Sequence, residues 1–141
     1  MDVDKVFKAL GDPYRIVILR LMIEENQSLC VCELVTILGL PQYQVSRHLA
    51  ILKKMDLVQV QKIGTWAYYS FNGSTPFNLL LSDFIKKVIS KNELSEVFRK
   101  MENRLDLRYN GRCVVGFEHE TKILGSPIHI PSGILRTKRK K

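Results

Sequence analysis

The stretch LCVCELVTILGLPQYQVSRHLAILKK, residues 29–54, contains two helical patterns separated by a tight turn. The first pattern covers residues 32–38 and is closed by Gly39, and the second follows Pro41 and covers residues 42–54. Glycine just after a helix and proline near the start of the next one are common boundary signals. The stretch therefore predicts a short helix, a tight turn and a longer helix.

The longer helix has one buried stripe and one acid-free polar face. At about 100° per residue, Val45, Leu49 and Leu52 fall within a narrow apolar stripe. The remaining, mostly opposite arc carries Tyr43, Gln44, Ser46, Arg47, Ala50 and Lys54. Because residues 41–54 include no acidic side chain, this helix is suited to approach a polyanion. A simply solvated amphipathic helix is the alternative interpretation.

The polar arc offers side chains that suit contacts with DNA. Arg47 could donate two hydrogen bonds to guanine, and Gln44 could pair with adenine. Ser46 or Tyr43 could bind a phosphate or a base edge. Lys54 completes the candidate DNA-binding set on this helix.

The segments on either side complete a larger pattern. Residues 2–10 and 13–26 show helical spacing, with Asp12 as the N-cap of the second segment. Residues 58–71 alternate and are rich in β-prone side chains around an Ile63-Gly64 turn, which predicts a two-stranded hairpin. The order of elements predicts a mainly α fold with a small β-hairpin, which is the layout of a winged helix-turn-helix.

The hairpin tip would extend the DNA-reading surface. In this layout Lys62 and Thr65 would touch the DNA backbone or the minor groove beside the helix. The following residues are interpreted as core rather than as base-stacking or ligand-binding groups: His48, Trp66, Tyr68 and Tyr69.

Two further helical patterns follow the hairpin. Thr75-Pro76 caps the first, and Ser90 with Glu93 resembles a capping box that opens the second. Their apolar surface fits either a dimer interface or a roof over the core. A strand is predicted within residues 112–117.

The composition fits one globular domain with a short appendage: 141 residues, of which 45% are hydrophobic and 26% charged. We expect a DNA-binding and dimerisation domain over residues 1–108 and a C-terminal extension over residues 109–141. The net charge, 22 basic minus 14 acidic residues, is +8. Since residues 136–141 hold five basic side chains in a tail expected to be disordered, the net charge is a weak indicator of nucleic-acid binding.

The cysteine count and the apolar runs exclude several protein classes. Three cysteines, Cys30, Cys32 and Cys113, make a disulfide framework improbable, which favours the reducing cytoplasm. The apolar runs are far shorter than the roughly 20 residues that span a bilayer, so no membrane partner is expected. Neither a glycine-rich phosphate loop nor a nucleophile-base constellation occurs, which argues against a thiol-dependent enzyme.

Cys30 and Cys32 flank the predicted start of the first helix in the opening stretch. A helix N-terminus lowers the pKa of a thiol, so both sulfurs are placed to become thiolates that bind soft metals. Residues i and i+2 of a helix point about 200° apart, so one ion cannot bridge them unless Cys30 lies outside the helix or the first turn unwinds. A ligand that demands both sulfurs would then distort the helix and lower DNA affinity. Two small buried residues or a redox pair are the alternatives.

Several segments together resemble the ArsR/SmtB family of dimeric winged-helix repressors. They are LCVCEL (29–34), LPQ (40–42), VSRHL (45–49), LK (52–53), GTW (64–66) and YY (68–69). The resemblance spans roughly residues 3–108, and the Cys-Val-Cys-Glu-Leu box is typical of arsenite-responsive members. It implies a homodimer, joined through the first and last helices, that binds operator DNA of inverted-repeat character. It further implies release when As(III) or Sb(III), as inducer, binds Cys30 and Cys32, with no cofactor required.

Two departures from the family pattern bear on the inducer. Some arsenite sensors have a third cysteine where this chain has Val35, so the third ligand is Cys113, an exogenous thiol, a solvent oxygen, or nothing. Zinc sensors carry a histidine ligand on the last helix, but residues 77–108 of this chain contain no histidine. Cadmium and lead sensors carry additional cysteines near the start, but residues 1–29 of this chain contain none. The absence of that histidine and of those early cysteines favours As(III) or Sb(III); a regulator that senses Cd, Pb or an oxidant through the same thiols is the alternative.

Overall fold

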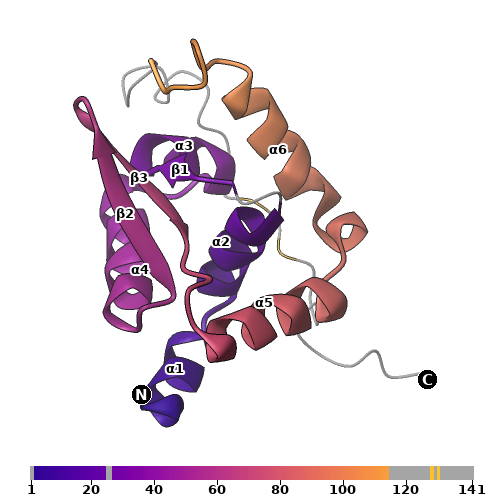
Figure 1. The fold of residues 1–141 in the computed structure, drawn as a ribbon. Helices are drawn as coiled ribbons and strands as arrows, with labels where there is room; N and C mark the ends of the chain where they lie inside the picture. The colour runs from indigo at the N-terminus through magenta and orange to yellow at the C-terminus, as the bar shows by residue number, and fades with distance from the viewer. Residues whose placement is uncertain (1, 25–26, 115–127, 129, 131–141) are drawn as a thin grey trace.

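The computed structural model describes residues 2–24, 27–114, 128 and 130 (Figure 1). The chain forms, in order, α1 (Val3–Ala9), α2 (Pro13–Ile23), β1 (Leu29–Cys30), α3 (Val31–Leu38), α4 (Gln42–Lys54), β2 (Val58–Ile63), β3 (Trp66–Phe71), α5 (Pro76–Val88), the 3-10 helix η2 (Lys91–Leu94) and α6 (Ser95–Leu105). No helix in the described part of the chain is both long enough and apolar enough to cross a membrane.

Local capping determines where the helices begin and end. The Asp12 carboxylate accepts a hydrogen bond of 2.8 Å from the backbone N–H of Tyr14. The Thr75 hydroxyl accepts one of 3.1 Å from the N–H of Asn78, and in both helices proline occupies the first turn. Helix α3 ends at Gly39, whose φ of 66° is a left-handed conformation that glycine adopts without strain. The predicted boundaries of these helices are confirmed to within a few residues.

The sheet is antiparallel and has the strand order β1-β3-β2. Strands β2 and β3 form the predicted hairpin, with Ile63 paired to Trp66 across the turn at Gly64 and Thr65. Strand β1 adds a third strand that was not predicted, because two residues are too few to show an alternating pattern. In it Cys30 pairs with Tyr68 of β3. The winged helix-turn-helix fold is thus confirmed.

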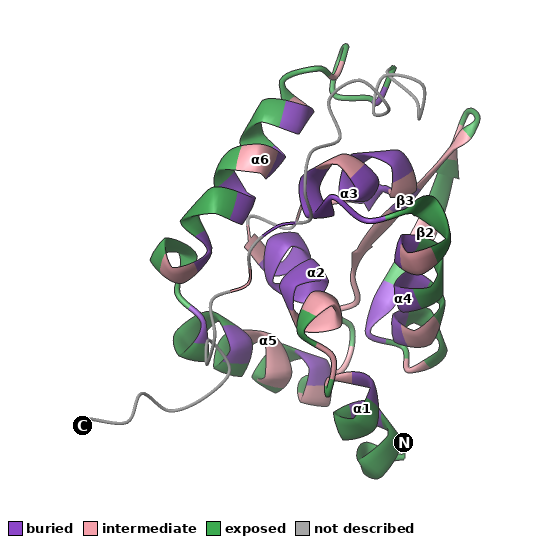
Figure 2. Cartoon of the chain, turned by 180° about the vertical axis from the view of Figure 1, so that it is seen from behind, coloured by how far each residue is buried: buried purple, intermediate pink, exposed green. Residues whose placement is uncertain are grey.

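Helix α2 lies at the centre of the molecule, surrounded by α3, α4, α5 and α6 (Figure 1). Every residue from 17 to 23 is buried, and Figure 2 shows this helix as buried over most of its length. The group includes Arg20, whose Nε donates to the carbonyl of Ile89 at 2.8 Å and whose Nη1 contacts Glu24 at 2.7 Å. The hydrogen bond from Arg20 lowers the pKa of Glu24. A buried arginine thus joins the central helix to the end of α5.

Three local predictions need correction or fall outside the described residues. The segment after Ser90 begins as the 3-10 helix η2, in which the Ser90 hydroxyl accepts a hydrogen bond from the N–H of Glu93. Helix α6 starts only after η2. Residues 113–114 are not in a strand; Arg112 makes a single bridge to Tyr109, and residues 115–117 lie outside the described part. The basic tail at 136–141 also lies outside it.

Asn78 connects α5 to the turn between α4 and β2, which supplies a test of the fold. Its buried amide donates to the carbonyls of Asp56 at 2.9 Å and Asn72 at 2.7 Å. Replacing Asn78 with alanine leaves these carbonyls without that donor, so the free energy of unfolding should fall by about 2 kcal/mol. Urea denaturation measures the change, with the exposed Asn103→Ala as the control. Equal losses in the two variants would contradict the role of Asn78.

Candidate thiol site and DNA-reading face

The two neighbouring cysteines meet because Cys30 lies just outside helix α3. Cys30 ends strand β1 and is the N-cap of α3, with an extended backbone (φ −90°, ψ 165°). Its N–H donates to the Glu33 carboxylate at 3.0 Å, an interaction typical of a capping box. From this position the Cys30 Sγ lies 2.9 Å from the Sγ of Cys32. The expectation that a ligand must distort the helix is therefore wrong. Cys30 lies outside the helix, which is one of the two geometries that allow one ion to bind both sulfurs, so the sulfurs already lie together.

Cys113 is the third member of the same cluster. Its Sγ lies 3.4 Å from that of Cys32, and the three sulfurs all lie within 4.8 Å of one another. All three are buried, reduced thiols. The N–H of Cys113 donates to the hydroxyl oxygen of Tyr68 at 2.8 Å. The structure therefore brings all three cysteines together within one chain.

A buried ion pair borders the thiol cluster. The Glu33 carboxylate, which is fully buried, contacts Arg108 through Nε and Nη2, each at 2.6 Å. Arg108 also donates to the carbonyl of Ser28 at 2.8 Å. Burial lowers the pKa of Arg108, but the hydrogen bond and charge of Glu33 outweigh it, so the pKa is raised overall. Sequence reasoning missed this pair because 75 residues separate its members and no local pattern joins them.

The expectation that Cys30 becomes a thiolate is wrong. The pKa of Cys30 is raised by its hydrogen bond with Cys32, by burial and by the nearby Glu33 charge. Burial likewise raises the pKa of Cys113. At Cys30, the hydrogen bond with Cys32, burial and the adjacent carboxylate together outweigh the field of the helix N-terminus. These thiols are therefore held protonated, and a ligand must displace their protons.

The DNA-reading candidates lie on α4 and at the tip of the hairpin; strand β2 lies beside α4, and the tip projects beyond that helix (Figures 1 and 2). The exposed candidates are Tyr43, Ser46, Arg47, Lys54, Lys62 and Thr65, and Gln44 is half-buried. The Arg47 guanidinium lies 5.9 Å from the centre of the Tyr43 ring. Gln44 Nε2 donates to the Tyr43 hydroxyl at 3.3 Å. The first turns of α4 thus present a connected group of polar side chains.

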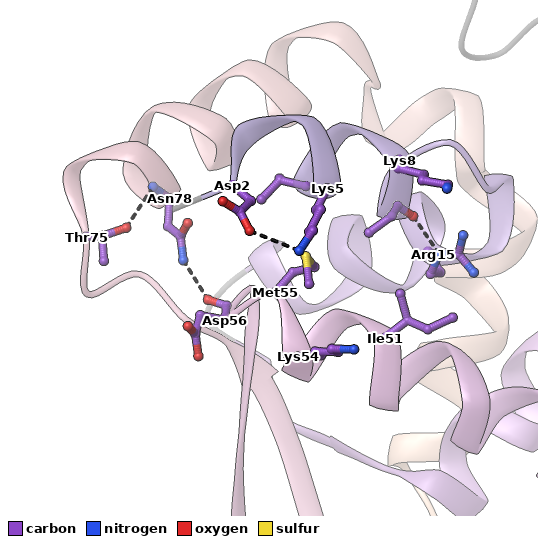
Figure 3. A pocket seen from close by; sticks show the side chains of 12 residues that line it. Asp2, Lys5, Lys8, Arg15, Ile51, Lys54, Met55, Asp56, Thr75 and Asn78 are labelled. Carbon is purple, nitrogen blue, oxygen red and sulfur yellow. Dashed lines mark hydrogen bonds and ion pairs between the residues drawn. The ribbon is translucent and has the colours of Figure 1, made fainter.

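Lys54 lies apart from the other candidates on α4. It is at the last residue of the helix, about 16 Å along the axis from Tyr43 at 1.5 Å per residue. There it lines a pocket of about 670 Å³ between α1, the end of α4 and the start of α5 (Figure 3). Basic side chains around this pocket include Lys5, Lys8 and Arg15.

The residues interpreted as core are buried to different extents. Tyr68 is buried, whereas Trp66 and Tyr69 are half-buried. His48 is buried, with its ring stacked on Tyr14 at 6.1 Å between centroids. Its Nδ1 lies 3.3 Å from Arg15 Nη1. The interpretation of His48 as a packed residue agrees with this setting.

Comparisons with known proteins agree on one family. The family described as bacterial regulatory protein, arsR family, matches residues 12–60. An uncharacterized HTH-type transcriptional regulator of Methanocaldococcus jannaschii is 41% identical over 85 residues, 60% of this chain and 84% of that protein. An arsenical resistance operon repressor of Bacillus subtilis is 35% identical over 97 residues, 69% of this chain and 82% of that protein. Reduced HlyU from Vibrio cholerae shares the fold, with a TM-score of 0.55 at 24% identity, over 62% of this chain and 88% of that one.

The environment of His48 predicts a pH dependence of stability. Burial lowers its pKa below the usual 6.5, so the unfolded chain binds this proton more readily than the folded one. The contribution of neutral His48 is therefore complete above pH 6.5 and is lost as the pH falls through the lower pKa of the folded state. Urea unfolding at about pH 7.5 and about pH 5.5 should show the wild-type advantage over His48→Gln shrinking at the lower pH. A constant difference between the two proteins would contradict this prediction.

Proposed function

Because this chain belongs to the ArsR family of bacterial regulatory proteins, we propose that it is a homodimeric repressor that binds operator DNA and is released by As(III) or Sb(III). The metalloid binds Cys30, Cys32 and Cys113. One observation carries this proposal: three buried thiols of one chain lie within 4.8 Å of one another beside the helix-turn-helix. Sulfur is the donor that soft, thiophilic ions select.

The charge balance of the reaction favours a trivalent metalloid. When three thiols bind arsenous acid, three As–O bonds break, three As–S bonds form, and the thiol protons leave with the hydroxides as three water molecules. The product is neutral, which suits a buried site where an uncompensated charge is costly. A divalent ion such as Cd²⁺ on three thiolates would leave one net negative charge near the fully buried Glu33. The Cys30 and Cys113 thiols, whose pKa values are raised, thus suit the metalloid better.

The apolar faces of α1 and α5 support a homodimer. Large apolar side chains are exposed there, namely Val3, Phe7, Leu79, Leu80, Phe84 and Val88. Exposed apolar clusters on a small protein commonly mark an interface. A second copy of this chain would cover them, and a two-fold dimer would place two α4 helices on an operator with two related half-sites. The prediction that the last helix also contributes is retained in this proposal.

The proposed DNA contacts come from three places: the first turns of α4, the wing, and the last residue of α4. Arg47 and Gln44 read base edges, and Ser46 and Tyr43 hold a phosphate or a base edge. Lys62 and Thr65 contact the backbone or the minor groove from the wing. Lys54, at the far end of α4, contacts a backbone phosphate away from the other contacts.

We propose the domain division at residue 108 with one qualification. The winged domain covers residues 1–108, and the extension of 109–141 supplies the third sulfur through Cys113. Another extension residue, Ile128, is buried and donates its N–H to the carbonyl of Leu38 at 3.0 Å. Cys113 lies near the start of α3 and Ile128 at its end, so these two described residues of the extension lie against the winged domain.

Serine substitution tests the thiol site. Cys30→Ser and Cys32→Ser should each bind operator DNA like the wild type, because both residues lie away from the exposed face of α4. Arsenite should weaken wild-type binding by about 5- to 150-fold and leave the variants bound. Fluorescence anisotropy of an operator selected from genomic fragments measures both. Release of either variant at wild-type arsenite concentrations would contradict the assignment, and parallel titrations with Cd²⁺ and peroxide distinguish the other inducers.

Alanine substitution tests the DNA-reading helix. Arg47→Ala should weaken specific operator binding by about 1 to 3 kcal/mol, because it removes a bidentate base contact. Lys62→Ala is the matched control: the loss of a backbone contact should weaken binding to all sequences alike. Unchanged affinity and an unchanged footprint for Arg47→Ala would exclude α4 from base reading.

A further inference from the structure

Tyr68 links the thiol cluster to the wing. It lies on β3, is buried, and pairs through the backbone with Cys30 of β1 and with Gln61 of β2. Its hydroxyl oxygen also accepts the 2.8 Å hydrogen bond from the N–H of Cys113. A single wing residue is therefore in contact with the segments that carry two of the three sulfurs.

The thiol cluster and the wing also share one packed group. Cys30, Cys32, Tyr68 and Cys113 form a buried cluster, and Ile63 and Trp66 pack against it. Ile63 and Trp66 are the last paired residues before the hairpin tip, where the DNA-binding candidates Lys62 and Thr65 lie. The cluster thus rests against the part of the wing that we propose to touch DNA.

We propose that Tyr68 is a positioning residue that holds Cys113 in place for three-sulfur binding and transmits occupancy of the thiol site to the wing. This inference rests on the proposed function, since it concerns how that same site is completed and read out. The hydrogen bond to Tyr68 holds the backbone of Cys113 in a segment without regular helix or strand. When the three sulfurs close around one atom, the movement of Cys113 reaches β3 through this bond. It then reaches Ile63 and Trp66 through their shared packing.

The cation beside Tyr68 is consistent with a fixed ring. The Arg108 guanidinium lies 5.5 Å from the centre of the Tyr68 ring, and Arg108 is itself held by the buried Glu33. The Tyr68 ring is therefore held in position relative to α3. A movement of Cys113 then acts on strand β3 rather than on a side chain that turns freely.

The only tryptophan of the chain, Trp66, reports directly on this route. In the full-length wild type, arsenite should change the fluorescence of Trp66, and X-ray absorption at the arsenic edge should count three sulfurs. In Tyr68→Phe the ring remains but the acceptor for Cys113 is lost. We expect two sulfurs, an arsenite affinity about tenfold weaker, and a Trp66 response reduced at least about fivefold.

Two variants control this result. Tyr69→Phe removes the hydroxyl of the next residue on the same strand and should behave as the wild type in both measurements. Cys113→Ala breaks the route from its other end and should give the same two-sulfur state and the same loss of Trp66 response as Tyr68→Phe. Far-UV circular dichroism and thermal melting confirm that each variant is folded.

Specific outcomes overturn the inference. A Tyr68→Phe variant that binds arsenic through three sulfurs and keeps the full Trp66 response would overturn it. A full Trp66 response in Cys113→Ala would also overturn it, and so would a Tyr69→Phe variant that behaves like Tyr68→Phe. Repeating the titrations with Cd²⁺ separates this inference from the proposed function. If the wild type binds Cd²⁺ but not arsenite, the metalloid assignment fails and the same variants judge Tyr68 with Cd²⁺. If the wild type binds neither, both proposals fail.

Discussion

The buried ion pair between Glu33 and Arg108 is the interaction on which the arrangement of the thiol site depends. A carboxylate as deeply buried as Glu33 is stable only when it is paired and hydrogen bonded. Glu33 meets this requirement by binding the N–H of Cys30 on one side and Arg108 on the other. The pairing brings the chain just beyond α6 to the start of α3. Cys113 follows five residues after Arg108 and so reaches the two other thiols.

The same region serves two structural purposes at once. Strand β3 is the central strand of the sheet. It pairs with β2 to form the wing on one side, and on the other side it pairs with β1, the short strand that ends in Cys30. Helix α3 begins at the thiols and ends at the turn that leads into α4. A ligand at the thiols therefore lies beside the wing and at the start of the helix that leads into α4, without any need for α3 to unwind.

Buried charged side chains and exposed apolar ones each need a compensating partner. Arg20 and Glu33 are buried because each has partners that replace water. Phe7 and Leu80 are exposed although their transfer from water is favourable. In the proposed homodimer, a second copy of the chain would remove that cost by covering α1 and α5. The fold thus assembles the thiol site within one chain and leaves the apolar side chains of α1 and α5 exposed.

The sequence by itself determined the order of the helices, the wing and the buried stripe of α4, because capping residues and hydrophobic spacing act over a few neighbouring residues. It also singled out Cys30 and Cys32 and offered Cys113 as one of several third ligands. Only the tertiary structure decided that Cys30 lies ahead of α3, that the hydrogen bond with Cys32 and burial raise the pKa of its thiol, and that Cys113 and Arg108 join it. These contacts link residues that are 75 to 81 positions apart, and local pattern carries no information over such a separation.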